Sequence, residues 1–189
     1  MDQLKIKEAV SVLRRGGTVI YPTDTIYGIG VDATNEQAVK HLLELKHRSP
    51  AKGLSLMVGS FAAIERMVQL SSKTKTMLRD KLPGPYTFVL PYIHIQAIAS
   101  SCIYNNTIAI RMPNHPVALE LAHAFGKPIT ATSANLAGKP PLSSLKSLKS
   151  LGADYVLWVG KLPESLPSTV VDLTQKKPRL RRGGAGQWP

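Results

Sequence analysis

Several stretches of the chain repeat their apolar positions with the spacing of an amphipathic helix. Residues 4–17 predict a first helix that ends at Gly16 and Gly17, because glycine favours the position just after a helix. Residues 34–46 predict a second helix, which begins with a capping box of Thr34 and Gln37. Further helices are expected at residues 60–70, 72–82 and 114–126, the last between Asn114 as N-cap and Gly126.

Short runs rich in β-branched residues alternate with these helices. They predict strands at residues 18–21, 54–58, 86–92, 107–112, 128–133, 154–159 and 168–173. Interleaved strands and helices indicate one α/β domain over residues 1–189, with a twisted, mostly mixed sheet and flanking helices. The basic, glycine-rich stretch 176–189 is expected either to be flexible or to close over a bound nucleotide.

Composition adds one unusual feature, a large positive charge. The chain has 24 Lys and Arg against 12 Asp and Glu, a net charge of +12, which favours polyanionic partners such as nucleotides or RNA. Cys102 is the single cysteine, so an intrachain disulfide is excluded. No apolar run approaches the length of a membrane span, and the charged N-terminus does not resemble a signal peptide. We therefore expect a cytoplasmic protein.

Common catalytic motifs are missing from the sequence. There is no GxxxxGK[ST] phosphate loop, and "YGIG" supplies only two glycines of a dinucleotide fingerprint. The five histidines form no HExxH pattern, and no GxSxG nucleophile elbow occurs. These absences weaken the usual hydrolase and metalloenzyme interpretations.

Four polar segments instead follow predicted strands or helices. They are "YPTDTIYG" (21–28), "KHRSPAKG" (46–53), "TSANLAGKPP" (132–141) and "STVVD" (168–172). Taken alone, the third is typical of a turn and the second of a solvated helix end. Their combination in one short chain favours a ligand site, because strand ends of α/β folds gather backbone donors and side chains.

These segments also carry a family resemblance. The chain contains, in this order, "YPTDTIYGIG", "LELKHRSPAKGLSLMV", "LPGPYTFVL", "TIAIRMPNHPVA", "ITATSANLAGKPP", "STVVDL" and "LRRGG". In their order they resemble the YrdC family, from about residue 10 to residue 184, in its short, single-domain form. The resemblance implies a YrdC-like fold with a basic concave cleft.

The resemblance also implies an activity, that of a threonylcarbamoyl-AMP synthase. Such an enzyme is a nucleotidyltransferase that converts L-threonine, bicarbonate and ATP to threonylcarbamoyl adenylate and pyrophosphate. A partner transferase then moves the threonylcarbamoyl group to adenosine 37 of tRNA, which gives the t6A modification. A site rich in Lys, Arg, Ser, Thr and Asn suits this chemistry, which needs charge neutralisation and alignment more than a side-chain nucleophile.

Individual roles follow from matching this sequence to the family motifs. Lys46 and Arg48 match a K-x-R pair and are expected to be catalytic, facing the phosphates together with Lys52. The remaining ATP-binding positions are Thr107, Ser133, Asn135, Pro141 and Arg182, although Arg181 could take the place of Arg182. The threonine-binding positions are Thr25, Met57, Arg111, Ala131 and Ser168. Arg111 is the natural carboxylate partner, and Met57 stands where longer members often have His.

Two alternatives and one cofactor complete these expectations. The net charge of +12 also suits an RNA-binding or ribosome-maturation module, although aromatic residues are few at 6%. A carbamoyl-phosphate-dependent module, as in hydrogenase maturation factors, lacks its accompanying domains here. Mg²⁺ is expected to arrive with ATP and to be held mainly by phosphates, because no acidic cluster indicates a metal site built by the protein.

Overall fold

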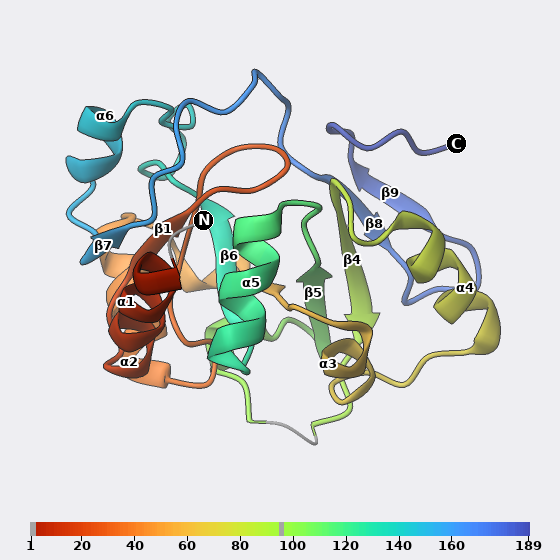
Figure 1. Cartoon of the computed structure of the whole chain (residues 1–189). Helices are drawn as coiled ribbons and strands as arrows, with labels where there is room; N and C mark the ends of the chain where they lie inside the picture. The colour runs from red at the N-terminus through yellow and green to blue at the C-terminus, as the bar shows by residue number, and fades with distance from the viewer. Residues whose placement is uncertain (1–2, 95–96) are drawn as a thin grey trace.

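The strands lie in one mixed sheet in the computed structural model, which describes residues 3–94 and 97–189. Across this described part, the strand order is β7-β1-β2-β6-β3-β5-β4-β8-β9 (Figure 1). The strands are β1 (Val19–Tyr21), β2 (Gly28–Gly30), β3 (Ser55–Met57), β4 (Tyr86–Pro91), β5 (Thr107–Arg111), β6 (Ile129–Ser133), β7 (Tyr155–Val156), β8 (Thr169–Asp172) and β9 (Arg179–Arg182). Neighbours β1 and β7, β3 and β5, and β4 and β8 run parallel, and the other pairs are antiparallel.

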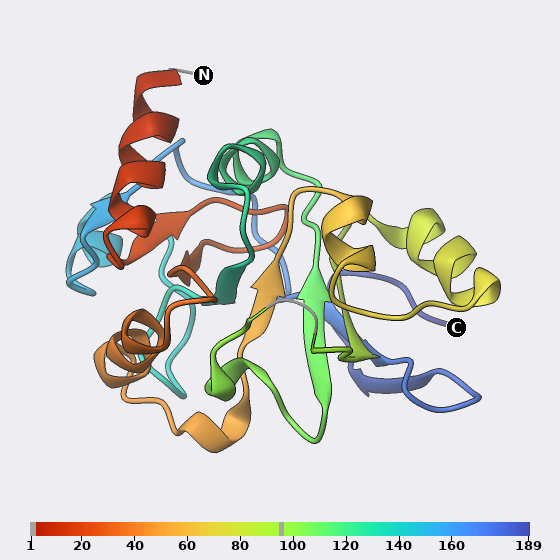
Figure 2. The ribbon, with the colours of Figure 1, turned by 90° about the horizontal axis from the view of Figure 1, so that it is seen from below.

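The helices flank this sheet and are connected to it by short loops. They are α1 (Gln3–Arg14), α2 (Glu36–Leu45), α3 (Phe61–Glu65), α4 (Ser72–Lys81), α5 (Pro116–Phe125) and α6 (Leu145–Lys149), with 3₁₀ turns η1 (Pro50–Lys52) and η2 (Ser100–Cys102). Helices α1 and α5 lie side by side on one side of the sheet, and α2 lies on the other (Figure 2). The expected α/β class with a mixed sheet and flanking helices is confirmed.

Strand register assigns the side chains to the two faces of the sheet. Met57 packs with α1 and α5 in a smaller core that also contains Val19 and Ile129. Met57 pairs with Arg111 of β5, and Ser55, two residues earlier, pairs with Ala131 of β6. Paired positions and positions two apart share a face, so Arg111 and Ala131 lie on the same face as Met57. Helices α1 and α5 cover one part of this face, and the rest carries polar side chains.

The opposite face carries the larger core. Here α2 packs the apolar positions Val39 and Leu42 against strand residues such as Ile20 and Leu56, all of them fully buried. The two cores cover the opposite face and part of the first face, and the polar residues of the central strands, such as Ser55 and Arg111, lie where the first face is left open. The predicted apolar face of residues 34–46 is confirmed.

Two predicted helix starts are wrong by one residue. The N-cap of α2 is Asn35, whose side chain accepts from the Ala38 N–H at 3.1 Å, while the Thr34 hydroxyl donates to Asp32. The N-cap of α5 is His115 and makes no side-chain capping bond. Asn and Thr are both good capping residues, so the sequence did not distinguish which neighbour takes the position. Gly126 ends α5 in a left-handed conformation, as expected.

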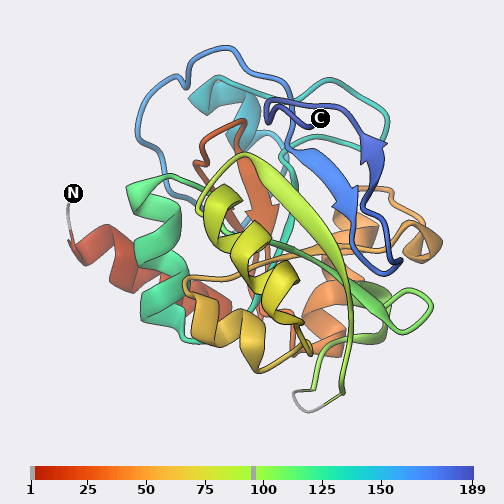
Figure 3. The same cartoon turned by 90° about the vertical axis from the view of Figure 1, so that its right-hand side faces the viewer.

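The C-terminal stretch is built into the sheet. Residues Arg179–Arg182 form β9, which pairs antiparallel with β8 at the edge beyond β4 (Figure 3). The following residues return along the sheet, where the Tyr86 hydroxyl donates to the carbonyl of Gln187 at 2.8 Å. The ring of Trp188 meets Phe88 edge-on, with 6.1 Å between ring centroids. Among the described residues, no helix has the length and apolarity needed to cross a bilayer.

Candidate functional site

A cleft of about 160 Å³ opens on the sheet face that α1 and α5 cover only in part. Three arginines from different parts of the chain line it: Arg48, Arg111 and Arg182. The other polar lining residues carry hydroxyl groups: Tyr21, Thr23, Tyr27, Ser55, Thr87, Thr132, Ser133 and Ser168. No carboxylate occurs among the described residues that line the cleft. We call this hollow the arginine cleft; its charge suits an anionic ligand.

Arg111 ends β5 and is almost fully buried, with 9% of its surface exposed. Its Nη2 donates to Asp24 Oδ1 at 2.8 Å and lies 3.4 Å from the Thr25 hydroxyl. Its Nε is buried without a hydrogen-bond partner in the described part of the chain. An ion pair and the strand end thus fix the guanidinium at the cleft.

Lys46 lies elsewhere than the motif interpretation expected. It is 2% exposed, and its ammonium donates to the carbonyls of Ser133 and Asn135, each at 2.5 Å, and to Asn135 Oδ1 at 3.1 Å. It does not line the arginine cleft. Its ammonium thus contacts the loop after β6 and not the arginine cleft, whereas the sequence predicted that it faces the phosphates. Burial and then the positive charge of Arg48 lower the pKa of Lys46 to about 8.

Arg48 reaches the cleft because the chain turns sharply after α2. His47 has a positive φ of 50°, a conformation that non-glycine residues seldom adopt. The Arg48 side chain then donates from Nη2 to the carbonyl of Gly53 at 2.8 Å. Burial lowers the pKa of Arg48. The side chain of Lys52, expected beside it, lies outside the described part of the structure.

Ser133 is the last residue of β6, and Asn135 lies in the loop that follows it. Ser133 lines the cleft, and its hydroxyl donates to Asn135 Oδ1 at 2.7 Å. Asn135 is 9% exposed and donates from Nδ2 to the carbonyl of Lys139. The Asn135 side chain therefore makes its hydrogen bonds within the protein, and of the two residues it is Ser133 that lines the cleft.

Ser168 and Arg182 line the cleft together with Thr87 of β4. The Ser168 hydroxyl is 2.8 Å from that of Thr87, and Arg182 donates from Nη2 to the Ser168 carbonyl at 2.7 Å. Partial burial and then the charge of Arg111 lower the pKa of Arg182. Arg181 instead pairs with Asp172 at 2.5 Å, so Arg182 is the arginine of "LRRGG" that lines the cleft.

The other predicted positions are dispersed. Ala131 lines the cleft, whereas Thr25 and Pro141 line an adjoining side pocket of about 330 Å³ that shares Ile26 and Tyr27 with it. Met57 is fully buried in the smaller core and does not line the cleft. Thr107 lies at the other end of β5 from Arg111, and its hydroxyl donates to the Tyr104 carbonyl at 2.6 Å.

Several residues in or beside the cleft received no role from the sequence. Thr87 and Ser55 are polar residues within apolar strands, a signal that indicates a buried polar site. Asp24, the partner of Arg111, lies inside "YPTDTIYG" but is distant from Arg111 in sequence. Only the fold reveals such a pairing.

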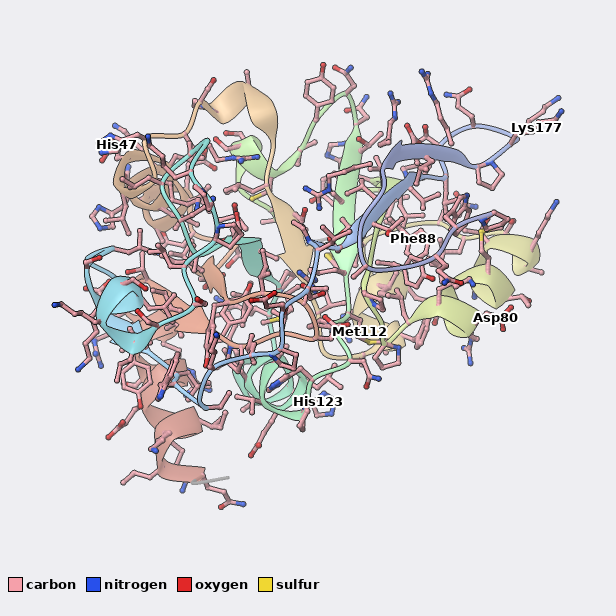
Figure 4. All side chains as sticks on the ribbon, turned by 90° about the horizontal axis from the view of Figure 1, so that it is seen from above. His47, Asp80, Phe88, Met112, His123 and Lys177 are labelled. Atoms are coloured by element: carbon pink, nitrogen blue, oxygen red, sulfur yellow. The ribbon has the colours of Figure 1, made fainter. Side chains whose placement is uncertain are left out.

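The donor set does not indicate a metal site built by the protein. No group of three or more His, Cys, Asp or Glu that could hold an ion occurs among the described residues. The view in Figure 4 places His47 at the end of α2 and Lys177 at the β8–β9 turn, on opposite sides of the molecule.

Comparisons with known proteins agree with this arrangement. The Sua5/YciO/YrdC profile, described as "Telomere recombination", matches residues 11–184. A protein of Vibrio vulnificus named threonylcarbamoyl-AMP synthase is 34% identical over 186 residues, which cover 94% of this chain and 98% of the relative. A relative of the same name from Photobacterium profundum is 37% identical over 155 residues, covering 79% and 81%.

A solved structure shows the same fold. The crystal structure of P. abyssi Sua5 complexed with L-threonine matches with a TM-score of 0.89 and 32% identity, over 97% of this chain and 55% of that one. A profile match over most of the chain and relatives above 30% identity lead to one conclusion: the chain belongs to the Sua5/YciO/YrdC family.

Proposed function

We propose that the chain is a threonylcarbamoyl-AMP synthase. It joins L-threonine, bicarbonate and ATP into threonylcarbamoyl adenylate and releases pyrophosphate. One observation carries the proposal: three arginines and a set of hydroxyl groups line one cleft, without a carboxylate among its described lining residues. The names of the Vibrio and Photobacterium relatives support the same activity.

The reaction needs alignment of anions more than a protein nucleophile. The threonine amine first combines with bicarbonate to give a carbamate and water. A carbamate oxygen then attacks the α-phosphorus of ATP, the bond from phosphorus to the bridging oxygen breaks, and pyrophosphate leaves with the electron pair. Both reactants are negatively charged, so a cationic site lowers the repulsion between them and stabilises the charge that develops.

Different residues of the cleft suit the two reactants. Arg48 and the Ser133 hydroxyl would face the phosphates, and Arg182 would close over the nucleotide from the β9 edge. Arg111 would bind the threonine carboxylate, close to the Ser168 hydroxyl and the small Ala131. The side pocket with Thr25 and Pro141 provides room beside the cleft. Met57 and Thr107 are left without direct contacts in this arrangement.

Mg²⁺ would enter with ATP. Its ligands would be phosphate oxygens and water, because no group of three or more His, Cys, Asp or Glu among the described residues could hold it. The chain itself contributes positive side chains that hold the same phosphates. The product would pass to a partner transferase that modifies tRNA, which implies a cytoplasmic location.

The direct test is pyrophosphate release by the purified protein. We expect pyrophosphate release only when ATP, threonine and bicarbonate are all present. With isotopically labelled bicarbonate, the label should appear in the carbamoyl carbon of the adenylate. Arg48→Ala serves as the cleft-disabled comparison. Release that continues without threonine or without bicarbonate would show a different reaction and overturn the proposal.

RNA binding is a second candidate function, favoured by the net charge of +12 and by the exposed Lys176, Lys177 and Arg179 around the β8–β9 turn. Binding through charge alone should weaken steeply as salt rises and should not distinguish RNAs of similar shape. Adenylate synthesis, with enclosed ligands, should depend less on salt. Tight RNA binding that persists at high salt would instead indicate a dedicated recognition surface.

A further inference from the structure

The lysine of the K-x-R pair and the loop of the S-x-N pair form one hydrogen-bonded unit. The Lys46 ammonium donates to the Ser133 carbonyl, the Asn135 carbonyl and Asn135 Oδ1. In return, the Lys46 carbonyl accepts from the Ala137 N–H at 2.9 Å. Lys46 therefore holds residues 133–139, which we call the S-x-N loop, through both its side chain and its backbone.

We propose that Lys46 is a positioning residue: its buried ammonium fixes the S-x-N loop so that Ser133 faces the nucleotide in the arginine cleft. Arg48, two residues further on, is the member of the pair that contacts the phosphates. The proposal rests on the proposed function for the identity of the ligand, ATP. The part that concerns the ligand-free loop is independent of it.

The geometry leaves Lys46 little capacity to bind a phosphate. A lysine ammonium has three N–H donors, and three acceptors within 3.1 Å match them. Its exposed fraction is 2%, and it is absent from the residues that line the cleft. To reach a phosphate, Lys46 would have to give up all three bonds. The buried Asn135 carbonyl would lose its charged donor, which is costly, whereas the Ser133 carbonyl and Asn135 Oδ1 would each keep one other donor.

The loop has few other fixed points. Beyond Lys46, the Ala134 N–H donates to the Tyr27 carbonyl at 2.9 Å and the Leu142 N–H donates to the Ala134 carbonyl at 3.0 Å. Residues 136–139 are exposed and include Gly138, whose φ is 78°. Their position is held from inside by Asn135, which contacts Lys46 and the Lys139 carbonyl. Removing the ammonium should therefore loosen the loop more than the strand β6 that precedes it.

The experiment compares Lys46→Met with Lys40→Met, which makes the same substitution at an exposed position of α2, the helix that Lys46 caps. Amide hydrogen exchange in the ligand-free protein reports the order of the S-x-N loop. Separate titrations of ATP and of threonine report binding. We expect at least tenfold faster exchange over residues 135–139 and at least tenfold weaker ATP binding in Lys46→Met, with threonine affinity within about twofold. Lys40→Met should match the wild type in all three.

Three results would overturn the proposal. Weaker ATP binding with unchanged loop exchange would make Lys46 a phosphate ligand after all. Faster loop exchange with unchanged ATP binding would show that the order of the loop does not matter to the nucleotide. A uniform loss of both affinities would indicate general unfolding rather than positioning, and would also contradict it.

A milder variant covers the case in which Lys46→Met fails to fold. Of the three acceptors of Lys46, Asn135→Ala removes Oδ1 and keeps both carbonyls; it also removes the bonds of the Asn135 side chain to Ser133 and Lys139. Asn135→Ala should also speed the exchange of the loop amides and weaken ATP binding, each by a smaller factor than Lys46→Met. If neither changes, the proposal is contradicted. If the wild type makes no adenylate, the proposed function fails, while the exchange result still decides whether Lys46 holds the loop.

Discussion

Arg111 and Asp24 form an ion pair of 2.8 Å between β5 and the loop after β1, with the two side chains only 11% and 10% exposed. The second carboxylate oxygen of Asp24 accepts from the Asn114 N–H at 3.0 Å. The carboxylate thus connects the guanidinium to the backbone that leads into α5. Arg111 is oriented before any ligand arrives, and such preorganisation lowers the cost of binding.

Arg111→Ala should weaken threonine use strongly. Charged hydrogen bonds contribute about 1.5–3 kcal/mol, so we expect a loss of roughly ten- to a hundredfold in threonine affinity. ATP binding, which would rely on Arg48 and Ser133, should change far less. Separate titrations of the two substrates, with pyrophosphate release as the readout, measure both effects. A shift in the ATP requirement alone would refute the placement of the carboxylate.

Asp24→Asn should weaken threonine binding, although Asp24 is expected to act through Arg111 and not to contact threonine itself. The substitution removes the charge that orients Arg111 and places an amide near the Asn114 N–H, where the second carboxylate oxygen now accepts. We expect a loss of about tenfold in threonine affinity, equivalent to about 1.4 kcal/mol. Asp32→Asn is the matched control, since it removes a similarly buried carboxylate that pairs with Lys127 and does not line the cleft. Equal losses in the two variants would contradict a specific role for Asp24.

The two arginines of "LRRGG" should behave differently. Arg182→Ala removes a cation that lines the cleft and contacts Ser168, so ATP use should fall by about tenfold or more. Arg181→Ala removes a half-exposed partner of Asp172, which should cost less than about 1 kcal/mol of stability and leave synthesis nearly unchanged. Steady-state kinetics of the two single variants decide the assignment. A larger loss in Arg181→Ala would reverse it.

Much of the fold could be predicted from sequence because local signals were strong. The apolar spacing of α2 and the β-branched run of β5 each point to one structure, and both predictions are confirmed. The strand β2 was missed because its sequence, "GIG", has little strand propensity. It is glycine-rich for a spatial reason: a Cβ on Gly30 would lie 2.0 Å from the Thr130 carbonyl oxygen of the neighbouring strand.

The site was predicted less completely than the fold. The family motifs identified Arg48, Arg111 and Arg182, and all three line the same cleft. They did not separate a cation that lines the cleft from one that is buried behind it, as Lys46 is. That difference depends on the three acceptors that the S-x-N loop brings to the ammonium, and these come from residues far away in sequence.

The K-x-R pair should divide into a structural and a catalytic member. Lys46→Ala leaves a cavity and removes the charged donor of the buried Asn135 carbonyl. We therefore expect the free energy of unfolding to fall by about 3 kcal/mol and Tm to fall by about 5 °C or more. Arg48→Ala should cost less than about 1 kcal/mol of stability, because its side chain is only half-buried. It should nevertheless abolish most adenylate synthesis. Thermal unfolding of both variants beside the activity assay tests this division, and equal Tm values for the two would contradict it.

The pH dependence of Lys46 should separate stability from ATP binding. Burial and then the charge of Arg48 lower the pKa of Lys46 from 10.5 to about 8 in the folded protein. Between these two values the unfolded chain binds more protons than the folded one, so the contribution of Lys46 to the free energy of unfolding rises with pH. Below about pH 8 both states are protonated, and the cost of burying the charge is fully present.

ATP binding should change in the opposite direction over the same range. A neutral lysine amine has two N–H donors for the three acceptors of the S-x-N loop, so the loop should loosen as pH rises above about 8. We therefore expect weaker ATP binding but higher stability of the wild type relative to Lys46→Met between about pH 8 and pH 10. Thermal unfolding and ATP titration of both proteins across this range provide the measurement. If ATP affinity and stability instead fall together as pH rises, the protein is losing structure in general. That result would exclude Lys46 as the titrating group that holds the loop.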